Sequence, residues 1–204
     1  MSSSTHPTAR ARVLTDVIPG ALARDAALSL GFAGLIALAA QLYLYLPGNP
    51  VPITAQTFVV LAGGIALGAR RAAVGSGLYL ALGAVGLPWF AASNGATFGY
   101  IVGFALAATL LGAVAQRGRL RGPLGVTLAM VVGNLVIYAA GVAWVYAAFA
   151  ANPAFLSAFG LTGPVPFGTV LAYFVTPFLL GDAIKLALAV AVVPTVWRLV
   201  GRDR

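Results

Sequence analysis

The chain has 204 residues, of which 61% are hydrophobic and 8% are charged, whereas a typical soluble domain has about 25% charged residues. This composition excludes a water-soluble globular protein and predicts an all-α integral membrane protein of about six helices. The chain has no cysteine and a single histidine, His6, which excludes disulfides and cysteine- or histidine-based metal sites, so we expect no metal and no cofactor.

Three regions are expected along the chain. Residues 1–25 are polar, without an apolar segment that leads into a cleavage-type site, and this favours a cytoplasmic or interfacial tail over a signal peptide. Residues 26–197 hold the long apolar segments and are expected to form the transmembrane domain. Residues 198–204 are expected to be a basic cytoplasmic tail.

Six apolar segments of the transmembrane domain are expected to be membrane spans. They are residues 26–46, 58–67, 72–87, 100–115, 124–149 and 169–193. The second is too short to cross a bilayer alone, so it is either a tilted helix lengthened by Gln56 and Thr57 or a half-buried helix. In the first, Ala33 and Ala37 have a spacing of small side chains that lets another helix approach closely. Chance in an alanine-rich segment explains this spacing equally well.

The arginines predict the orientation of these spans. With six spans, all arginines fall in the terminal regions or in the connections that contain Arg70 and Arg117, on one side of the membrane. Basic residues favour cytoplasmic loops, so both termini of this multi-pass protein are expected on the cytoplasmic side of the cell membrane. The net charge of +8 is then explained by anionic lipid headgroups, and nucleic acid is not an expected partner.

Two charged residues lie inside the last apolar segment. Lys185 is the only lysine of the chain and Asp182 is one of four acidic residues. Three residues apart on a helix, they face roughly the same side. An ionisable side chain at membrane depth costs about 2.5–3.5 kcal/mol on insertion scales, so it is by default a candidate functional residue. The alternative is an internal ion pair that only fixes a helix contact.

The three connections on the opposite side from the arginines are uncharged and rich in Gly, Pro, Asn, Ser and Thr. Irregular backbone at membrane depth is tolerated only where it is buried or lines a cavity, so we expect these connections to cover an outward-facing pocket that reaches Asp182. The further candidate ligand contacts are Asn94, Gln56, Thr57, Trp89 and Tyr100. Each has a structural alternative: a turn, a helix start or an interfacial aromatic residue.

Enzymatic activity is not expected. The chain has no cysteine or histidine within the spans, so nothing resembles a nucleophile with its base or a metal centre, and we predict no catalytic residues. The phosphate-binding signature G-x-x-x-x-G-K-[ST] is also absent. The chain therefore cannot hydrolyse ATP by itself, and energy for transport would have to come from an ion gradient or from partner subunits.

Four sequence elements resemble those of BioY proteins and occur in the same order. They are Pro50-Val-Pro-Ile-Thr-Ala-Gln-Thr, Gly83-Ala-Val-Gly-Leu-Pro-Trp-Phe-Ala, Gly95-Ala-Thr-Phe-Gly-Tyr-Ile-Val-Gly-Phe and Gly181-Asp-Ala-Ile-Lys. Together they cover most of the membrane domain. The third departs from the family pattern, because Ala96 stands for proline and Phe98, after Thr97, stands for glycine.

BioY proteins are the biotin-binding S subunits of energy-coupling factor (ECF) transporters. The resemblance implies an S-component-like bundle of six helices, biotin bound near the outer face, and biotin uptake. It also implies partners, namely a transmembrane coupling subunit, which would contact Ala33 and Ala37, and two ABC ATPases. Function without dedicated partners and a homo-oligomer are left open.

The resemblance also implies roles for individual residues. Asp182 is expected to accept hydrogen bonds from the ureido N–H groups of biotin, and Asn94 to complete the contacts around the ring. Lys185 is expected to donate to the ureido carbonyl or to a carboxylate, and which end of biotin it meets stays open because no arginine lies on the outer side. Thr97, in the third of these sequence elements, is also expected to contact biotin. The alternatives are an S subunit for another small vitamin and a purely structural membrane subunit.

Overall fold

The computed structural model describes residues 22–47, 51–89, 95–118, 120, 122–158 and 160–200, with side chains up to residue 195. Its elements in chain order are α1 (Leu22–Gln41), β1 (Tyr43–Leu44), β2 (Ile53–Thr54), α2 (Gln56–Leu67), α3 (Ala69–Ala84), α4 (Phe98–Ala115), α5 (Pro123–Phe149), α6 (Pro153–Ala158), α7 (Phe167–Phe174) and α8 (Thr176–Val200). The two short strands are antiparallel, and Tyr43 pairs with Thr54.

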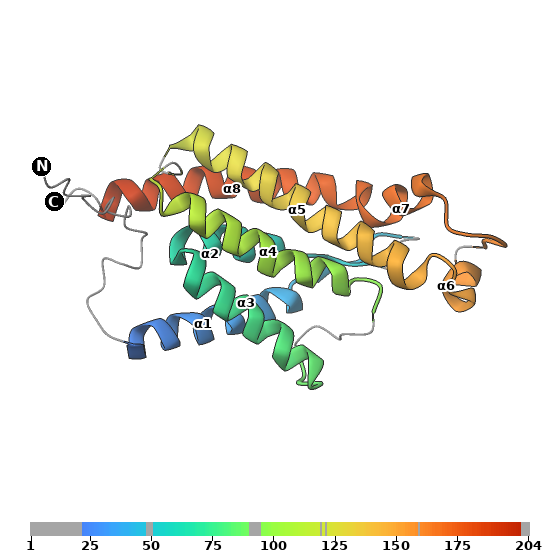
Figure 1. Ribbon diagram of the computed structural model, residues 1–204. Coiled ribbons are helices and arrows are strands. Elements are labelled where there is room, and N and C mark those ends of the chain that lie inside the picture. The colour runs from blue at the N-terminus through green and yellow to red at the C-terminus, as the bar shows by residue number, and fades with distance from the viewer. Residues whose placement is uncertain are drawn as a thin grey trace, which may run out of the picture.

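Helix α4 is the central helix of the bundle (Figure 1). It packs against α2, α3 and α5, while α1 packs mainly against α3, and α8 packs against α5, α2 and α7. Small and apolar side chains of α4, among them Phe104, Ala107 and Ala108, are almost completely buried. This packing brings α2, α4, α5 and α8 together around the residues that form the candidate site.

The two ends of the bundle differ in charge. One end, which we call the uncharged end, holds the described residues 42–47, 51–55, 85–89, 95–97, 150–158 and 160–175, a set without any charged residue. At the other end, which we call the basic end, α1 starts, α2 meets α3 and α4 leads into α5 (Figure 1). The described arginines Arg24, Arg70, Arg71 and Arg117 belong to these segments.

Large apolar side chains are exposed along the helices. Leu35 of α1, Leu128 of α5 and Leu180 of α8 are all more than half exposed. Such a surface suits lipid, which is as apolar as leucine. Four described helices are long and apolar enough to cross a membrane: α1, α4, α5 and the Thr176–Thr195 part of α8. The all-α membrane bundle is thus confirmed. Helix α2, with 12 residues, and helix α3, with 16, are shorter than these four helices.

Two of the predicted span limits are wrong. The first span was expected to reach residue 46, but α1 ends at Gln41 because the chain turns into the β1–β2 ladder. The last span was expected to be continuous from residue 169, but the helix breaks at Val175, between α7 and α8. Pro177, in the first turn of α8, explains this break, since proline lacks an N–H group and disfavours helical geometry in the residue before it.

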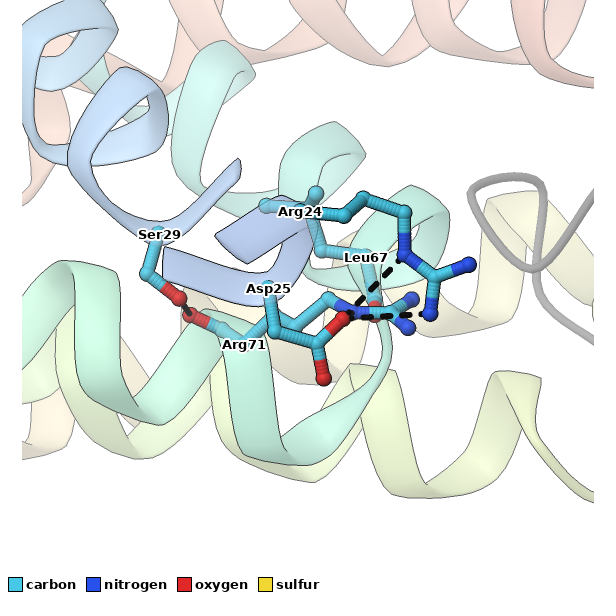
Figure 2. Close-up of polar contacts among 5 residues, drawn as sticks. All are labelled: Arg24, Asp25, Ser29, Leu67 and Arg71. Carbon is cyan, nitrogen blue, oxygen red and sulfur yellow. Dashed lines mark hydrogen bonds and ion pairs between the residues drawn. The ribbon is translucent and has the colours of Figure 1, made fainter. Parts of the chain in front are cut away.

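An ion-pair cluster joins three helices at the basic end (Figure 2). The Arg71 Nε atom lies 2.9 Å from Asp25 Oδ1, and Arg24 Nη2 lies 3.2 Å from the same oxygen. Arg71 Nη1 also donates to the carbonyl of Leu67, which ends α2, and Ser29 donates to the carbonyl of Arg71. Arg71 is buried, and it connects α1, the end of α2 and the start of α3. Arg24 and Asp25, expected in the tail, therefore lie in α1.

The contact between α2 and α4 depends on a glycine. A Cβ atom on Gly64 would lie 2.6 Å from the carbonyl oxygen of Ala108, which belongs to rigid helix backbone. We expect Gly64→Ala to destabilise the protein by about 1–3 kcal/mol, the usual cost of overpacking, and to lower the melting temperature in detergent by about 3–10 °C. Thermal unfolding followed by circular dichroism measures this shift.

Gly77→Ala on α3 is the matched control. No atom lies within 4 Å of the position of its Cβ, and alanine favours a helix over glycine by about 0.5–1 kcal/mol. Its melting temperature should equal or exceed that of the wild type. Equal melting temperatures for the two variants would contradict the close approach of α2 and α4.

Candidate functional site

A cavity of about 120 Å³ lies between α2, α4, α5 and α8 and reaches the uncharged end through the β2 segment. Its lining combines one acid, one base, neutral polar groups and aromatic rings. The lining residues are Val51, Pro52, Thr54, Gln56, Thr57, Thr97, Tyr100, Ile101, Phe104, Ile137, Tyr138, Phe178, Asp182 and Lys185. A mostly apolar wall with a few convergent polar groups is typical of a small-molecule site.

Asp182 and Lys185 form an ion pair in this cavity. The Lys185 Nζ atom lies 3.0 Å from Asp182 Oδ1, and the two side chains are 13% and 8% exposed, respectively. Thr57 of α2 completes a triangle with them: Lys185 Nζ donates to Thr57 Oγ1 over 2.8 Å, and Thr57 Oγ1 donates to Asp182 Oδ1 over 3.1 Å. Tyr138 of α5 donates to the other carboxylate oxygen, Oδ2. The carboxylate is therefore held by three helices.

Gln56 is fixed at the start of α2. It is almost completely buried, and its Nε2 atom donates to the hydroxyl of Tyr79 on α3 over 2.8 Å. The hydroxyl of Thr54 donates to Gln56 Oε1 and accepts a hydrogen bond from the Gln56 backbone N–H. A hydroxyl two residues before a helical N–H is a common way to satisfy the first turn. The prolines before Thr54 prevent the helix from starting earlier.

Aromatic rings form one wall of the cavity. The ring of Tyr100 lies 6.5 Å from that of Tyr138 in an edge-to-face arrangement and 6.3 Å from that of Phe178. The hydroxyl of Tyr100 donates to the backbone carbonyl of Phe174, the last residue of α7. This hydrogen bond connects α7 to α4, and all three rings line the cavity.

Six of the predicted contacts line this cavity: Asp182, Lys185, Gln56, Thr57, Thr97 and Tyr100. Trp89 is not among the lining residues. It follows α3 with a positive φ of 74° and is 63% exposed, so its role in ligand binding stays a prediction. Asn94 lies outside the described residues, and its role stays a prediction.

Ala33 and Ala37 are buried within this chain, and their role at a partner interface stays a prediction. They were assigned to a partner interface, but they are only 2% and 3% exposed. Both belong to the buried core of this chain, and α1 as a whole packs against α2 and α3. The close approach that small residues allow is therefore already used inside the bundle.

Tyr138 is the main residue that sequence analysis did not assign to the site. A tyrosine in the middle of an apolar span needs a hydrogen-bond partner for its hydroxyl, and this requirement was the available signal. That the partner is Asp182 depends on how α5 and α8 pack, which the spacing of residues in one segment does not reveal.

The fold and the site together define a polytopic membrane protein with a cavity of mixed polar and apolar lining that contains a buried ion pair. The model of the BioY family matches residues 7–202, and the chain belongs to this family. No group of three or more His, Cys, Asp and Glu side chains able to hold a metal ion occurs within the described part of the chain.

Several relatives cover most of this chain. It is 30% identical over 177 residues to a "Probable biotin transporter BioY" of Pyrococcus horikoshii, and this match covers 83% of this chain and 94% of the relative. It is 34% identical over 179 residues to the "Biotin transporter BioY" of Rhizobium etli, with 80% and 94% covered. A "Probable biotin transporter BioY" of Lysinibacillus sphaericus is 36% identical over 123 residues, which cover 57% of this chain and 62% of that protein.

A solved structure shares the fold. It is described as the crystal structure at 2.1 Å of the S-component for biotin from an ECF-type ABC transporter. It matches with a TM-score of 0.66 and 21% identity, over 86% of this chain and 92% of the other. The S-component-like fold is therefore confirmed, and the relatives are transporters and not enzymes, as expected.

Proposed function

We propose that this protein takes up biotin across the bacterial cytoplasmic membrane as the substrate-binding subunit of an ECF-type transporter. The observation that carries the proposal is the cavity in which Asp182 and Lys185 lie beside Thr57 and Tyr138. Biotin has a ureido ring with two N–H donors and one carbonyl acceptor, an apolar second ring and a tail that ends in a carboxylate. A carboxylate accepts hydrogen bonds and an ammonium group donates them, so the pair is complementary to the ureido group.

The remaining lining residues suit the rest of the ligand. Tyr100, Phe104 and Phe178 provide apolar surface for the second ring and the tail. Gln56 and Thr97 add polar groups nearer the uncharged end, and Asn94 is proposed to complete the contacts with the ureido ring. The membership of the chain in the BioY family supports biotin over another vitamin.

We further propose six membrane crossings with both termini in the cytoplasm. A 12-residue helix such as α2 is about 18 Å long, less than the roughly 30 Å of the hydrocarbon core. The β2 segment before it packs on α8, where Ile53 lies beside Gly181, so irregular backbone covered by protein completes the crossing. The arginines at the basic end then all face the cytoplasm. ATP-hydrolysing partners, acting through a coupling subunit, would supply the energy for transport, because this chain cannot hydrolyse ATP by itself.

Biotin binding to the purified wild-type protein in detergent tests the proposal. A ligand present at about 100 times its Kd stabilises a folded protein by about 2.7 kcal/mol, which corresponds to a rise in melting temperature of about 5–10 °C. We expect such a rise with biotin and not with riboflavin or thiamine. A rise with another vitamin but not with biotin would assign the chain to a different substrate, and no rise with any of them would favour a structural subunit.

A further inference from the structure

A second cavity, of about 280 Å³, lies between α4 and α5 near the basic end. Its lining contains only glycine, alanine, valine and leucine residues. Among them, Leu111 and Ala129 are almost completely buried, whereas Leu110, Leu128 and Val132 are between 41% and 57% exposed. The cavity is therefore an apolar groove that opens on the lipid-facing surface of the bundle, and we call it the α4–α5 groove.

A basic residue lies at one end of this groove. Arg117 follows α4, and its backbone N–H donates to the carbonyl of Val114 over 3.1 Å. Val114 lines the groove, and so does Leu120, three residues after Arg117. The side chain of Arg117 is exposed and has no hydrogen bond or ion pair with the described residues. The sequence of the connection at 116–122 contains no acidic residue, so no neighbour in the chain neutralises this charge.

An apolar groove beside an unpaired cation is complementary to an anionic amphiphile. A phospholipid chain is flexible and can follow an uneven apolar surface, and a phosphate group is a strong hydrogen-bond partner for arginine. Basic sites between membrane helices bind anionic lipid headgroups in this way. A helix of another protein suits the groove less well, because close helix contacts in membranes need small residues, and the exposed lining residues Leu110, Leu128 and Val132 are large.

We propose that the α4–α5 groove binds one anionic phospholipid, with an acyl chain in the groove and the phosphate at Arg117. This site shares no lining residue with the cavity that contains Asp182 and Lys185, and the proposal does not rest on the proposed function. The bound lipid fills the space between α4 and α5 and holds the connection between these helices at the membrane surface.

The headgroup contact is tested with the full-length protein, freed of lipid in detergent, by titration followed with native mass spectrometry. We expect one molecule of phosphatidylglycerol to bind with a Kd about 3–10-fold lower than that of phosphatidylcholine with the same acyl chains, because only the former has a net negative charge. Arg117→Gln should abolish this preference. Arg70→Gln, which removes another exposed arginine of the basic end that does not line the groove, should retain it.

Three results would overturn the headgroup contact: equal Kd values for the two lipids in the wild type, a preference that survives in Arg117→Gln, or the same loss in both variants. The last result would mean that the lipid responds to the overall charge of the basic end and not to this groove.

The position of the acyl chain is tested by filling the groove. Ala129→Phe places a ring on its buried side, and we expect both lipids to bind at least about fivefold more weakly, because the apolar surface for the chain is occupied. Ala139→Phe, on an exposed part of α5 outside the groove, is the matched control and should bind both lipids as the wild type does. If Ala129→Phe does not fold, Val132→Trp at the exposed rim makes the same test.

Unchanged lipid binding in the variant with the filled groove would overturn the proposal. So would a wild-type dimer that dissociates in this variant but not in Ala139→Phe, since the groove would then be occupied by a second copy of the chain. Size-exclusion chromatography with light scattering measures the oligomeric state of the same samples.

Discussion

Lys185→Met is expected to lower the affinity for biotin at least about 100-fold, which corresponds to about 2.8 kcal/mol. The variant loses the donor that faces the ligand carbonyl, and it leaves Asp182 without its ion-pair partner in a site where that carboxylate is almost completely buried. Breaking one side of a buried pair costs about 3–5 kcal/mol, so the melting temperature should also fall. Calorimetric titration with biotin and thermal unfolding measure the two effects separately.

The double variant Asp182→Asn with Lys185→Met distinguishes a ligand site from a structural ion pair. Removing both charges abolishes the desolvation cost of each, and such replacements are often neutral or stabilising. We expect the double variant to recover most of the lost melting temperature and none of the lost affinity. If instead the single variants are unstable but retain wild-type affinity for biotin, the pair fixes a helix contact only.

The charged core of the site could be predicted from the sequence because charges are so rare in this chain. Asp182 and Lys185 are the only ionisable pair within a long apolar segment, and a three-residue spacing on a helix already places them on similar sides. In the structure the Lys185 Nζ atom lies 3.0 Å from Asp182 Oδ1. Gln56 and Thr57 were singled out as polar residues before a short apolar segment, and both line the cavity.

The other half of the site depends on contacts between helices, which local patterns do not contain. Tyr138 lies in an apolar segment whose sequence is equally consistent with a helix that faces lipid and with one that faces the site. Its hydroxyl reaches Asp182 because α5 packs against α8. Similarly, Ala33 and Ala37 mark a face on which another helix can approach. Whether that helix belongs to the same chain or to a partner depends on the tertiary structure, in which both residues are buried within this chain.

The fold was predictable in outline but not in its helix ends. Hydrophobicity alone identifies α4 and α5, because each is a long apolar segment whose limits in the structure lie within two residues of the expected ones. Hydrophobicity did not reveal the end of α1 at Gln41, since the residues that follow it are also apolar. Their extended conformation comes from pairing with β2, in which Tyr43 is opposite Thr54 and Leu44 is opposite Ile53. Such pairing between separate segments cannot be recognised from the residues after Gln41 alone.

Thr57→Val is expected to weaken biotin binding by about 10–100-fold. Valine has nearly the shape of threonine, so the change removes the hydroxyl while leaving the packing of α2 intact. The hydroxyl accepts from Lys185 over 2.8 Å and donates to Asp182 over 3.1 Å, and hydrogen bonds to charged groups contribute about 1.5–3 kcal/mol each. Without it, Lys185 and Asp182 lose the contact from α2 that fixes their positions relative to each other. Equilibrium binding of biotin to the purified variant measures the loss.

Thr57→Ser is the matched control because it keeps the hydroxyl and removes only a methyl group. If Thr57 acts through its two hydrogen bonds, the serine variant should bind biotin within about threefold of the wild type, although its melting temperature falls slightly through the small void. The valine variant should lose both affinity and melting temperature, because it removes two hydrogen bonds to buried charged groups. Equal affinities for the serine and valine variants would mean that Thr57 contributes packing rather than orientation. Of the described hydrogen-bond partners of the ion pair that lie outside α8, Tyr138 alone would then position it.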